Sequence, residues 1–177
     1  LSSALAYKRH YPAIDWLTSY SLYSDQVRRY FDGSVAEDWS AQAARVMSIL
    51  SEEAELEEIV RLVGVDALGY KDRMTLECAR SIREDFLQQN AFDDVDTYTS
   101  PEKQHAMLAI ILSWYDKGLA AIAEDVAFSK VTSMAALEGI SRMKYVPEGE
   151  FAAYMDGLKK QLNQEFAAMT EGGQADA

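Results

Sequence analysis

Cysteine and histidine are scarce in this sequence, and their scarcity excludes several kinds of site. The single cysteine, Cys78, cannot form an internal disulfide, and its apolar neighbours in MTLECARSI indicate a buried, inert thiol. The two histidines, His10 and His105, have no sequence context that suggests a catalytic triad. A zinc site usually needs three or four Cys, His or carboxylate ligands at a recognisable spacing. We therefore expect neither a catalytic residue nor a metal ligand in this chain.

Positive charge and phosphate-binding motifs are lacking as well. The 17 Lys and Arg residues are outnumbered by 29 Asp and Glu residues, which gives a formal charge of -12 and a pI near 4.6. A nucleic-acid backbone is bound through clustered Lys and Arg, so this composition argues against a nucleic-acid partner. The chain also contains no GxxxxGK[ST] loop, whose backbone amides and lysine would hold nucleotide phosphates.

Membrane-spanning and targeting segments are not apparent either. No stretch approaches the roughly 20 apolar residues of a membrane span, so we expect no direct membrane insertion. The N-terminal sequence LSSALAYKRH lacks the apolar core of a signal peptide, and the chain does not begin with Met. We expect a fragment of a longer protein that is made and kept in the cytoplasm.

Helical periodicity dominates the chain from Ser24 onward. Of the 177 residues 49% are hydrophobic, which is enough for a sizeable core, and apolar residues recur at three- and four-residue steps. Gly33 and Gly64 favour helix ends, and Ser100-Pro101 favours a helix start. The expected helices cover residues 24–31, 38–63, 72–89, 101–126, 129–144 and 148–168. The predicted fold class is all-α, an irregular bundle of about five to six helices.

The two ends of the chain differ from this bundle. Residues 1–23 are rich in Ser and Tyr, and Pro12 favours extended geometry in the residue before it. We expect residues 1–23 to be a short extended segment, the tail of an upstream domain. The helical bundle domain would then cover residues 24–169, followed by a disordered tail at 170–177.

Within the second expected helix, seven apolar residues recur at the three- and four-residue steps of a helix. These residues are Val46, Ile49, Leu50, Leu56, Ile59, Val60 and Val63.

The most specific strings are RHYPAIDWLTSYSLY at residues 9–23 and FLQQNAFDDVDTYTSPEKQ at residues 86–104. Together they resemble the catalytic A subunit of the archaeal and vacuolar (A/V-type) rotary ATP synthases. The resemblance covers residues 1 to about 125. It implies that the chain is the C-terminal part of that subunit, separated from its catalytic core, and that both strings face the adenine of bound ATP. The upstream tail would belong to the nucleotide-binding domain.

Adenine is a flat and weakly polar ring, so proteins usually hold it between aromatic faces. In this family and in the related F-type catalytic beta subunit, an aromatic residue before a Pro-Ala pair stacks on the base, and Tyr11 matches it. Phe92 matches a second aromatic residue, which follows a short linker containing Gln and Asn. The resemblance implies an adenine-binding set of Tyr11, Phe92, Tyr98, Thr99, Gln89 and Asn90. Because Gln89 and Asn90 end a helix, a purely capping role is an alternative for both.

A helical hairpin from Val46 to Phe86 is the second family feature. It resembles the part of the F-type beta subunit that carries the acidic DELSEED sequence and presses on the rotating shaft. Here the turn reads DALGYKD, so three acidic positions are lost and Lys71 is added. Contact with the shaft would therefore depend mainly on shape and apolar side chains. The implied rotor-contact residues are Asp66, Ala67, Leu68, Gly69, Tyr70, Lys71 and Asp72.

The resemblance also implies a cellular role. The parent subunit would make or hydrolyse ATP in the head of an ATP synthase, coupled to proton or sodium transport, with ATP or ADP and Mg as its cofactors. The isolated fragment should bind no cofactor and be inactive. Expected partners are the B subunit of the hexameric head, the central stalk rotor subunit and the upstream domain, in a cytoplasmic head peripheral to the membrane. A free-standing acidic helical adaptor for protein partners is the alternative.

Overall fold

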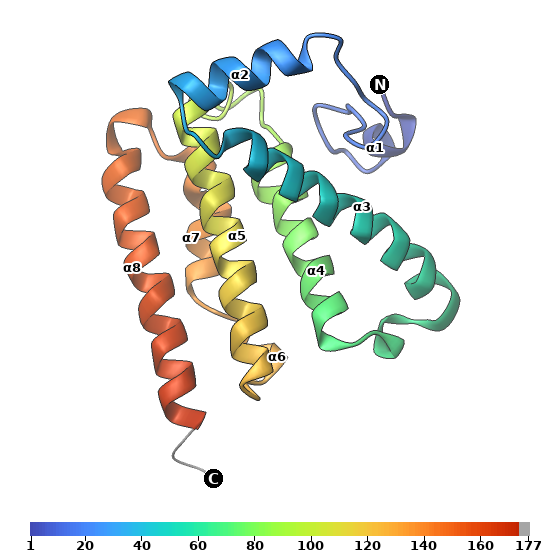
Figure 1. Cartoon of the computed structure of the whole chain (residues 1–177), viewed down its shortest axis with the longest axis vertical. Coiled ribbons are helices and arrows are strands. Elements are labelled where there is room, and N and C mark those ends of the chain that lie inside the picture. The colour runs from blue at the N-terminus through green and yellow to red at the C-terminus, as the bar shows by residue number, and fades with distance from the viewer. Residues whose placement is uncertain (174–177) are drawn as a thin grey trace.

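The computed structural model describes residues 1–173, and within this range the fold is all-helical, with no strand (Figure 1). The predicted all-α class is confirmed. The α-helices are α1 (Ser3–Tyr7), α2 (Ser24–Ser34), α3 (Trp39–Val63), α4 (Tyr70–Ser81), α5 (Pro101–Ala123), α6 (Phe128–Thr132), α7 (Ala136–Arg142) and α8 (Glu148–Gly173). The shorter elements are the 3-10 helices η1 (Val65–Ala67) and η3 (Met143–Tyr145) and the π-helix η2 (Ile82–Leu87).

Helix α5 forms the centre of the bundle. It packs between α4 and α8, while α3 packs against α4 on the outer side, so the long helices stand in a row (Figure 1). The buried face of α5 includes Met107, Ile111 and Trp114, and full burial of each large apolar side chain stabilises the fold by about 1.5–3 kcal/mol. Cys78 of α4 is buried in the same core, and burial raises the pKa of its thiol to about 12. The expected buried thiol is confirmed.

The apolar character of α5 exceeds the sequence-based expectation. By length and composition this 23-residue helix is apolar enough to cross a membrane, so the expectation that no stretch approaches a membrane span was wrong. Half of its most apolar window is buried inside the bundle. A central core helix needs apolar residues on most sides, which gives it the same composition.

Several helix boundaries agree with the predicted signals. The hydroxyl of Ser100 accepts a hydrogen bond from the backbone N–H of Lys103 at 3.1 Å, and Pro101 occupies the first turn of α5. Gly64 ends α3 with a φ of 86°, a left-handed conformation that favours glycine. The start of α5 and the end of α3 are therefore confirmed.

Other boundaries differ from the prediction. The expected helix 129–144 is divided into α6, α7 and η3, and the hydroxyl of Ser133 donates to the carbonyl of Ser129 at 2.7 Å. Such side-chain bonds compete with the backbone ladder and favour a break. The expected helix 72–89 begins at Tyr70 as α4 and continues as the π-helix η2. These interruptions explain why the described residues contain more helices than expected.

The two ends of the chain are more helical than predicted. Residues 3–7 form α1 instead of an extended segment, because Ala4, Leu5 and Ala6 favour a helix and the Ser2 hydroxyl caps it by accepting from the N–H of Leu5. Helix α8 continues to Gly173, beyond its expected end at residue 168. The last four residues of the predicted tail, 174–177, lie outside the described residues.

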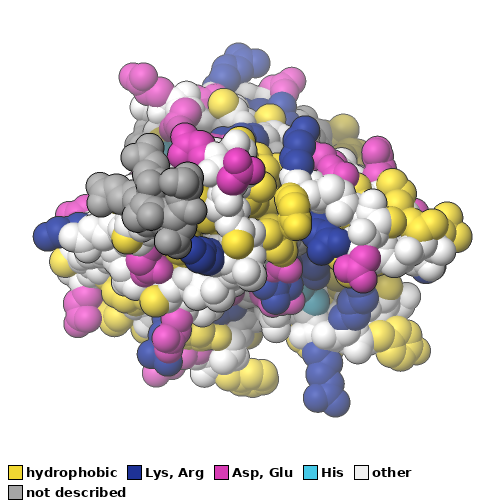
Figure 2. Space-filling model, turned by 90° about the horizontal axis from the view of Figure 1, so that it is seen from below, with side chains coloured by type: hydrophobic (Ala, Val, Ile, Leu, Met, Phe, Trp, Pro, Cys, Tyr) yellow, Lys and Arg dark blue, Asp and Glu magenta, His cyan; other side chains and the backbone are white. Residues whose placement is uncertain are grey.

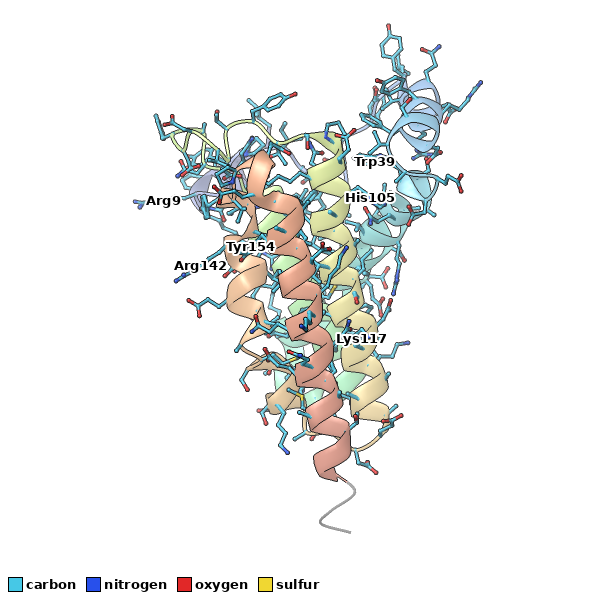
Figure 3. The ribbon with its side chains drawn as sticks, turned by 90° about the vertical axis from the view of Figure 1, so that its left-hand side faces the viewer. Arg9, Trp39, His105, Lys117, Arg142 and Tyr154 are labelled. Atoms are coloured by element: carbon cyan, nitrogen blue, oxygen red, sulfur yellow. The ribbon has the colours of Figure 1, made fainter. Side chains whose placement is uncertain are left out.

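Aromatic and polar contacts fix the outer helices on the bundle. Trp39, at the start of α3, stacks with Phe31 of α2. It also stacks with His105 of α5 (Figure 3). On the other side, the hydroxyl of Tyr154 on α8 donates to the carbonyl of Gly139 on α7 at 2.7 Å (Figure 3). The helices that surround the candidate site are thus tied to one core.

Candidate functional site

The two strings singled out in the sequence lie side by side. The backbone N–H of Gln89 donates to the carbonyl of Tyr11 at 2.7 Å, which joins the N-terminal segment to the loop after η2. His10 adds a second link, because its Nε2 donates to the carbonyl of Arg83 at 2.9 Å. Residues 9–23 and 86–104 therefore meet in the folded chain, as the prediction of a shared site requires.

A cavity of about 520 Å³ opens where these strings meet. Four of the six predicted adenine-binding residues line it: Tyr11, Gln89, Asn90 and Phe92. The side chain of Phe92 is 99% exposed and that of Tyr11 is 53% exposed, so both rings have surface available for stacking. The remaining lining residues are Gln88, Ala91, Lys144 and Tyr145.

Gln89 and Asn90 also stabilise the loop itself. The amide nitrogen of Gln89 donates to the carbonyl of Asp96 at 2.7 Å, and the Asn90 backbone N–H donates to the buried Asp96 carboxylate at 2.6 Å. The Asn90 side-chain oxygen accepts from the N–H of Phe92 at 3.1 Å. These bonds support the capping alternative for both residues. The Gln89 Oε1 and Asn90 Nδ2 atoms take no part in these bonds and belong to cavity-lining residues.

Tyr98 and Thr99 are not brought into this cavity. The side chain of Tyr98 is 74% exposed, and neither residue is among the lining residues. The carbonyl of Thr99 accepts from the Gln104 side chain at 2.9 Å, close to the start of α5. Their place in a nucleotide site stays a prediction.

Lys144 and Tyr145 are site residues that the sequence reasoning missed. The Lys144 ammonium donates to the carbonyls of Glu84 at 2.8 Å and Gln88 at 3.0 Å. Burial, followed by the nearby Asp96 carboxylate, raises the pKa of Tyr145. In the sequence Lys144 ends one expected helix and Tyr145 follows it in the connection to the next, without a motif, so no local signal identifies them.

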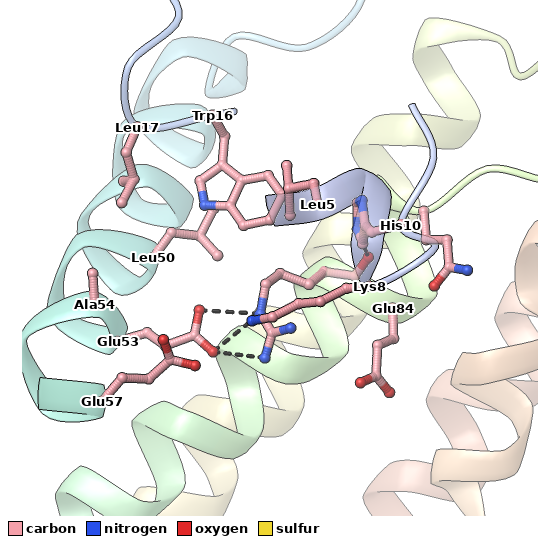
Figure 4. A pocket seen from close by; sticks show the side chains of 12 residues that line it. Leu5, Lys8, His10, Trp16, Leu17, Leu50, Glu53, Ala54, Glu57 and Glu84 are labelled. Carbon is pink, nitrogen blue, oxygen red and sulfur yellow. Dashed lines mark hydrogen bonds and ion pairs between the residues drawn. The ribbon is translucent and has the colours of Figure 1, made fainter. Parts of the chain in front are cut away.

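A second cavity of about 250 Å³ lies between the N-terminal segment, α3 and η2 (Figure 4). Arg83 donates to both carboxylate oxygens of Glu53 from Nε, at 3.0 and 3.1 Å, and to Oε1 from a terminal nitrogen at 2.8 Å. Burial raises the pKa of Glu53, although Arg83 acts in the opposite direction. The ring of Trp16 packs edge-on against His10 with centroids 5.4 Å apart. This contact region fastens residues 1–23 to the hairpin.

The predicted rotor-contact turn lies at the far end of the α3 and α4 hairpin (Figure 1). Leu68 is buried within it, so this side chain is not available for an external contact. The exposed ring of Tyr70 stacks on Phe128 with centroids 6.0 Å apart, and Arg73 pairs with Asp66 at 3.2 Å. Ala67, Gly69 and Lys71 are exposed and Asp72 is half-buried.

Apolar side chains that continue the periodic pattern of α3 are exposed beside this turn. Ile59 and Val63 face solvent at the end of α3, although they continue the helical spacing of its apolar residues. Further exposed apolar residues lie next to them, among them Leu62 of α3, which is 83% exposed, and Val65 at the start of η1. Ile59, Leu62, Val63, Val65 and Tyr70 are called the tip patch below. Figure 2 shows the molecule from below, with hydrophobic side chains reaching the surface between charged ones.

The site suits the base of a nucleotide better than its phosphates. Its cavity offers two exposed aromatic rings and amide groups, which match a flat, weakly polar ring. Its one ammonium, on Lys144, already bonds to two carbonyls. Among residues 1–173, no group of three or more His, Cys, Asp or Glu side chains could hold a metal ion.

Comparison with known proteins gives the family. The family model described as the C-terminal domain of V and A type ATP synthase matches residues 28–132. The protein named V-type ATP synthase alpha chain in Thermoanaerobacter pseudethanolicus is 50% identical over 177 residues, which are 100% of this chain and 30% of that protein.

Two further relatives carry the same name. The one from Acetivibrio thermocellus is 49% identical over 169 residues, covering 96% of this chain and 29% of the relative. The one from Clostridium novyi is 52% identical over 166 residues, which cover 93% of this chain and 28% of that relative. The chain thus spans only 28–30% of the length of these relatives. The matched family model covers more than half of the chain, and the chain therefore belongs to the family of C-terminal domains of V- and A-type ATP synthases.

Proposed function

We propose that this domain completes the adenine pocket of an ATP synthase catalytic subunit and transmits nucleotide-dependent movement to a central rotor. The relatives named V-type ATP synthase alpha chain support the first half of the proposal. The observation that carries it is the meeting of Tyr11 and Phe92 at one cavity, fixed by the hydrogen bond from Gln89 to Tyr11. Adenine would stack on these rings, with Gln89 and Asn90 at its polar edge. Tyr98 and Thr99 would join when the neighbouring parts of the subunit are present.

The mechanical half of the proposal depends on rigid coupling between the cavity and the tip patch. Residues 88–92, which follow η2 and line the cavity, are called the adenine loop. Arg83 of η2 is bonded to Glu53 of α3, so movement of the adenine loop displaces both arms of the hairpin together. Packed cores shift between discrete arrangements instead of bending continuously. The turn at residues 66–72 and the tip patch would then press on the central stalk rotor. Coupling free energies are reciprocal, so rotor movement would equally change nucleotide affinity.

The remaining functions would come from the rest of the parent protein. Phosphoryl transfer depends on positioned phosphates, Mg²⁺ and neutralising cations. We propose that the upstream domain, of which residues 1–23 are the tail, and the neighbouring B subunit supply these groups. The bundle at residues 24–169 would be inactive by itself. The assembled head would work at the cytoplasmic membrane surface and couple ATP turnover to proton or sodium transport.

Photo-labelling of the assembled complex with 2-azido-ATP, followed by mass spectrometry, tests the adenine assignment. We expect label on Tyr11, Phe92, Tyr98 or Tyr145, and we expect excess ATP to abolish it. The exposed Tyr20 and Tyr23, which are not among the cavity-lining residues, provide an internal control. Competable label confined to other residues, or equal label on Tyr20, would refute the assignment.

A further inference from the structure

Two buried lysines, Lys103 and Lys144, form successive hydrogen bonds next to the candidate pocket. Lys103 of α5 is 1% exposed, and its ammonium donates to the carbonyls of Lys144 at 2.9 Å and Val146 at 2.7 Å. Lys144 is itself buried, and its ammonium donates onward to the carbonyls of Glu84 and Gln88. Lys103 therefore holds the backbone around Lys144, and Lys144 holds the end of η2.

The position of the Lys144 ammonium has a clear physical reason. The last carbonyls of a helix have no partner within the helix, and positive charge is favourable there. The π-helix η2 ends at Leu87, and Gln88 turns into extended geometry with φ -75° and ψ 123°. Lys144 bonds one carbonyl inside η2, that of Glu84, and one just after it, that of Gln88. Bonds from an ammonium are stronger than neutral ones, so they fix the direction in which the chain leaves the helix.

The residues that leave the helix at this point are those of the candidate pocket. Gln88 is followed directly by Gln89, Asn90 and Phe92, and Lys144 also lines the cavity. We infer that Lys144 is a positioning residue for nucleotide binding, which acts by anchoring the start of the adenine loop. This inference rests on the proposed function, because it assumes that the loop binds the base. It adds a role for the segment between α7 and α8, which contains no motif.

The test uses the full-length subunit in its assembled complex. Lys144→Met removes the ammonium and keeps an apolar stem, Lys144→Arg keeps the charge, and Lys159→Met on the exposed side of α8 is the matched control. Two affinities are measured for each variant, that for ATP and that for tripolyphosphate, which has phosphates and no base. We expect Lys144→Met to weaken ATP binding by about tenfold, because two charge-assisted hydrogen bonds, to η2 and to the adenine loop, are lost. The affinity for tripolyphosphate should stay unchanged. Lys144→Arg should retain more affinity, and Lys159→Met should match the wild type.

Comparison with Phe92→Ala distinguishes a wrong pocket from a wrong role for Lys144. If Phe92→Ala leaves ATP affinity unchanged, the proposed pocket is wrong. If Phe92→Ala weakens ATP binding and Lys144→Met does not, the pocket stands and the positioning role is overturned. An equal loss of ATP and tripolyphosphate affinity in Lys144→Met would indicate general damage and would also overturn it. Should Lys144→Met fail to assemble, Lys144→Gln, which retains a donor, is measured against the same two ligands.

A double variant gives an independent check. If Lys144 acts through the loop that carries Phe92, the two substitutions share one effect. The loss in Lys144→Met with Phe92→Ala should then be smaller than the product of the separate losses. A loss equal to that product would mean that the residues act independently, which contradicts the inference.

Discussion

The backbone N–H of Gln89 donates a 2.7 Å hydrogen bond to the carbonyl of Tyr11 and so joins two segments that are far apart in the sequence. One such bond contributes about 1 kcal/mol, which would not hold the N-terminal segment by itself. The link from His10 to Arg83 and the pairing of Arg83 with Glu53 add further anchors. Together these contacts hold Tyr11 at the cavity.

Phe92→Ala should weaken nucleotide binding without harming the fold. Its ring is almost fully exposed, so the free energy of unfolding should change by less than about 0.5 kcal/mol. Loss of a base-stacking ring should raise the Michaelis constant for ATP in the assembled complex by about 5- to 10-fold, with a smaller effect on maximal rate. Steady-state kinetics measure this. Tyr20→Ala, at an equally exposed position outside the cavity, should leave both constants unchanged.

Leu62→Glu should disturb mechanical coupling more than nucleotide affinity. Leu62 is exposed in the tip patch, so a charge there should be tolerated by the isolated fold but should weaken an apolar contact with the rotor. The measurement is the number of ions transported per ATP hydrolysed by the assembled complex, and we expect that ratio to fall. Leu22→Glu, at an exposed leucine before α2, is the control. An unchanged ratio in Leu62→Glu, or an equal fall in Leu22→Glu, would contradict the rotor contact.

Arg83→Met should be strongly destabilising, because it leaves the buried Glu53 carboxylate without its charged partner. We expect a loss of about 3 kcal/mol in the free energy of unfolding, measured by urea denaturation of the 177-residue chain. Adding Glu53→Gln to this variant should recover part of the loss. Arg61→Met breaks a fully surface pair with Glu58 and should cost less than about 0.5 kcal/mol. Similar losses of unfolding free energy in Arg83→Met and Arg61→Met would contradict the idea that burial of Glu53 makes its ion pair important.

Two glycines in long helices should respond to alanine with opposite signs. A Cβ atom on Gly118 of α5 would lie 2.9 Å from Val131 Cγ1 and 2.7 Å from Met74 Cε, so Gly118→Ala should destabilise by about 1–3 kcal/mol. A Cβ atom on Gly157 of α8 would meet no atom within 4 Å apart from its chain neighbours and the backbone of its own helix. Gly157→Ala should therefore stabilise by about 0.5–1 kcal/mol. Thermal unfolding of the two variants checks this contrast. Equal shifts would mean that the packing around Gly118 is looser than described.

Asp85→Asn should stabilise the fold near neutral pH and not in acid. Burial raises the pKa of Asp85 above its ordinary value, so the folded state binds a proton more readily than the unfolded state does. The charged carboxylate therefore costs stability above the folded pKa, and this cost disappears as the pH falls below the unfolded value of about 3.9. At pH 7 the variant should gain roughly 1 kcal/mol or less, because Asn can still accept from the Ser81 hydroxyl. Urea denaturation at pH 7 and pH 3.5, with Asp94→Asn as an exposed control, measures the difference.

Local signals predicted much of this fold. Ser100-Pro101 and Gly64 marked real helix ends because capping and a left-handed φ are properties of a few neighbouring residues. Periodicity likewise identified the apolar residues of α3, but it could not show where along the helix other elements stop packing against them. Ile59 and Val63 continue the pattern and are nevertheless exposed, at the end of α3 where this helix and α4 diverge (Figure 1).

The candidate site was predictable only in part. Tyr11 and Phe92 were found through the family resemblance, and the structure places both at one cavity. Lys144 was missed, because lysine is usually a surface residue and its burial here depends on carbonyls from a distant element. Tyr98 and Thr99 matched the family pattern in sequence, yet the spacing alone could not say on which side of the loop they would lie.

The hydrogen bonds of Lys144 to the end of η2 also have a consequence for folding kinetics. The cavity needs Tyr11, the loop after η2 and the segment at Lys144, which are widely separated along the chain. Contacts of high sequence separation require costly loop closure and form slowly. The α3 and α4 hairpin closes over a shorter span, so it should form first. During synthesis on the ribosome, the cavity cannot be completed until Tyr145 has emerged, which makes it a late product of folding.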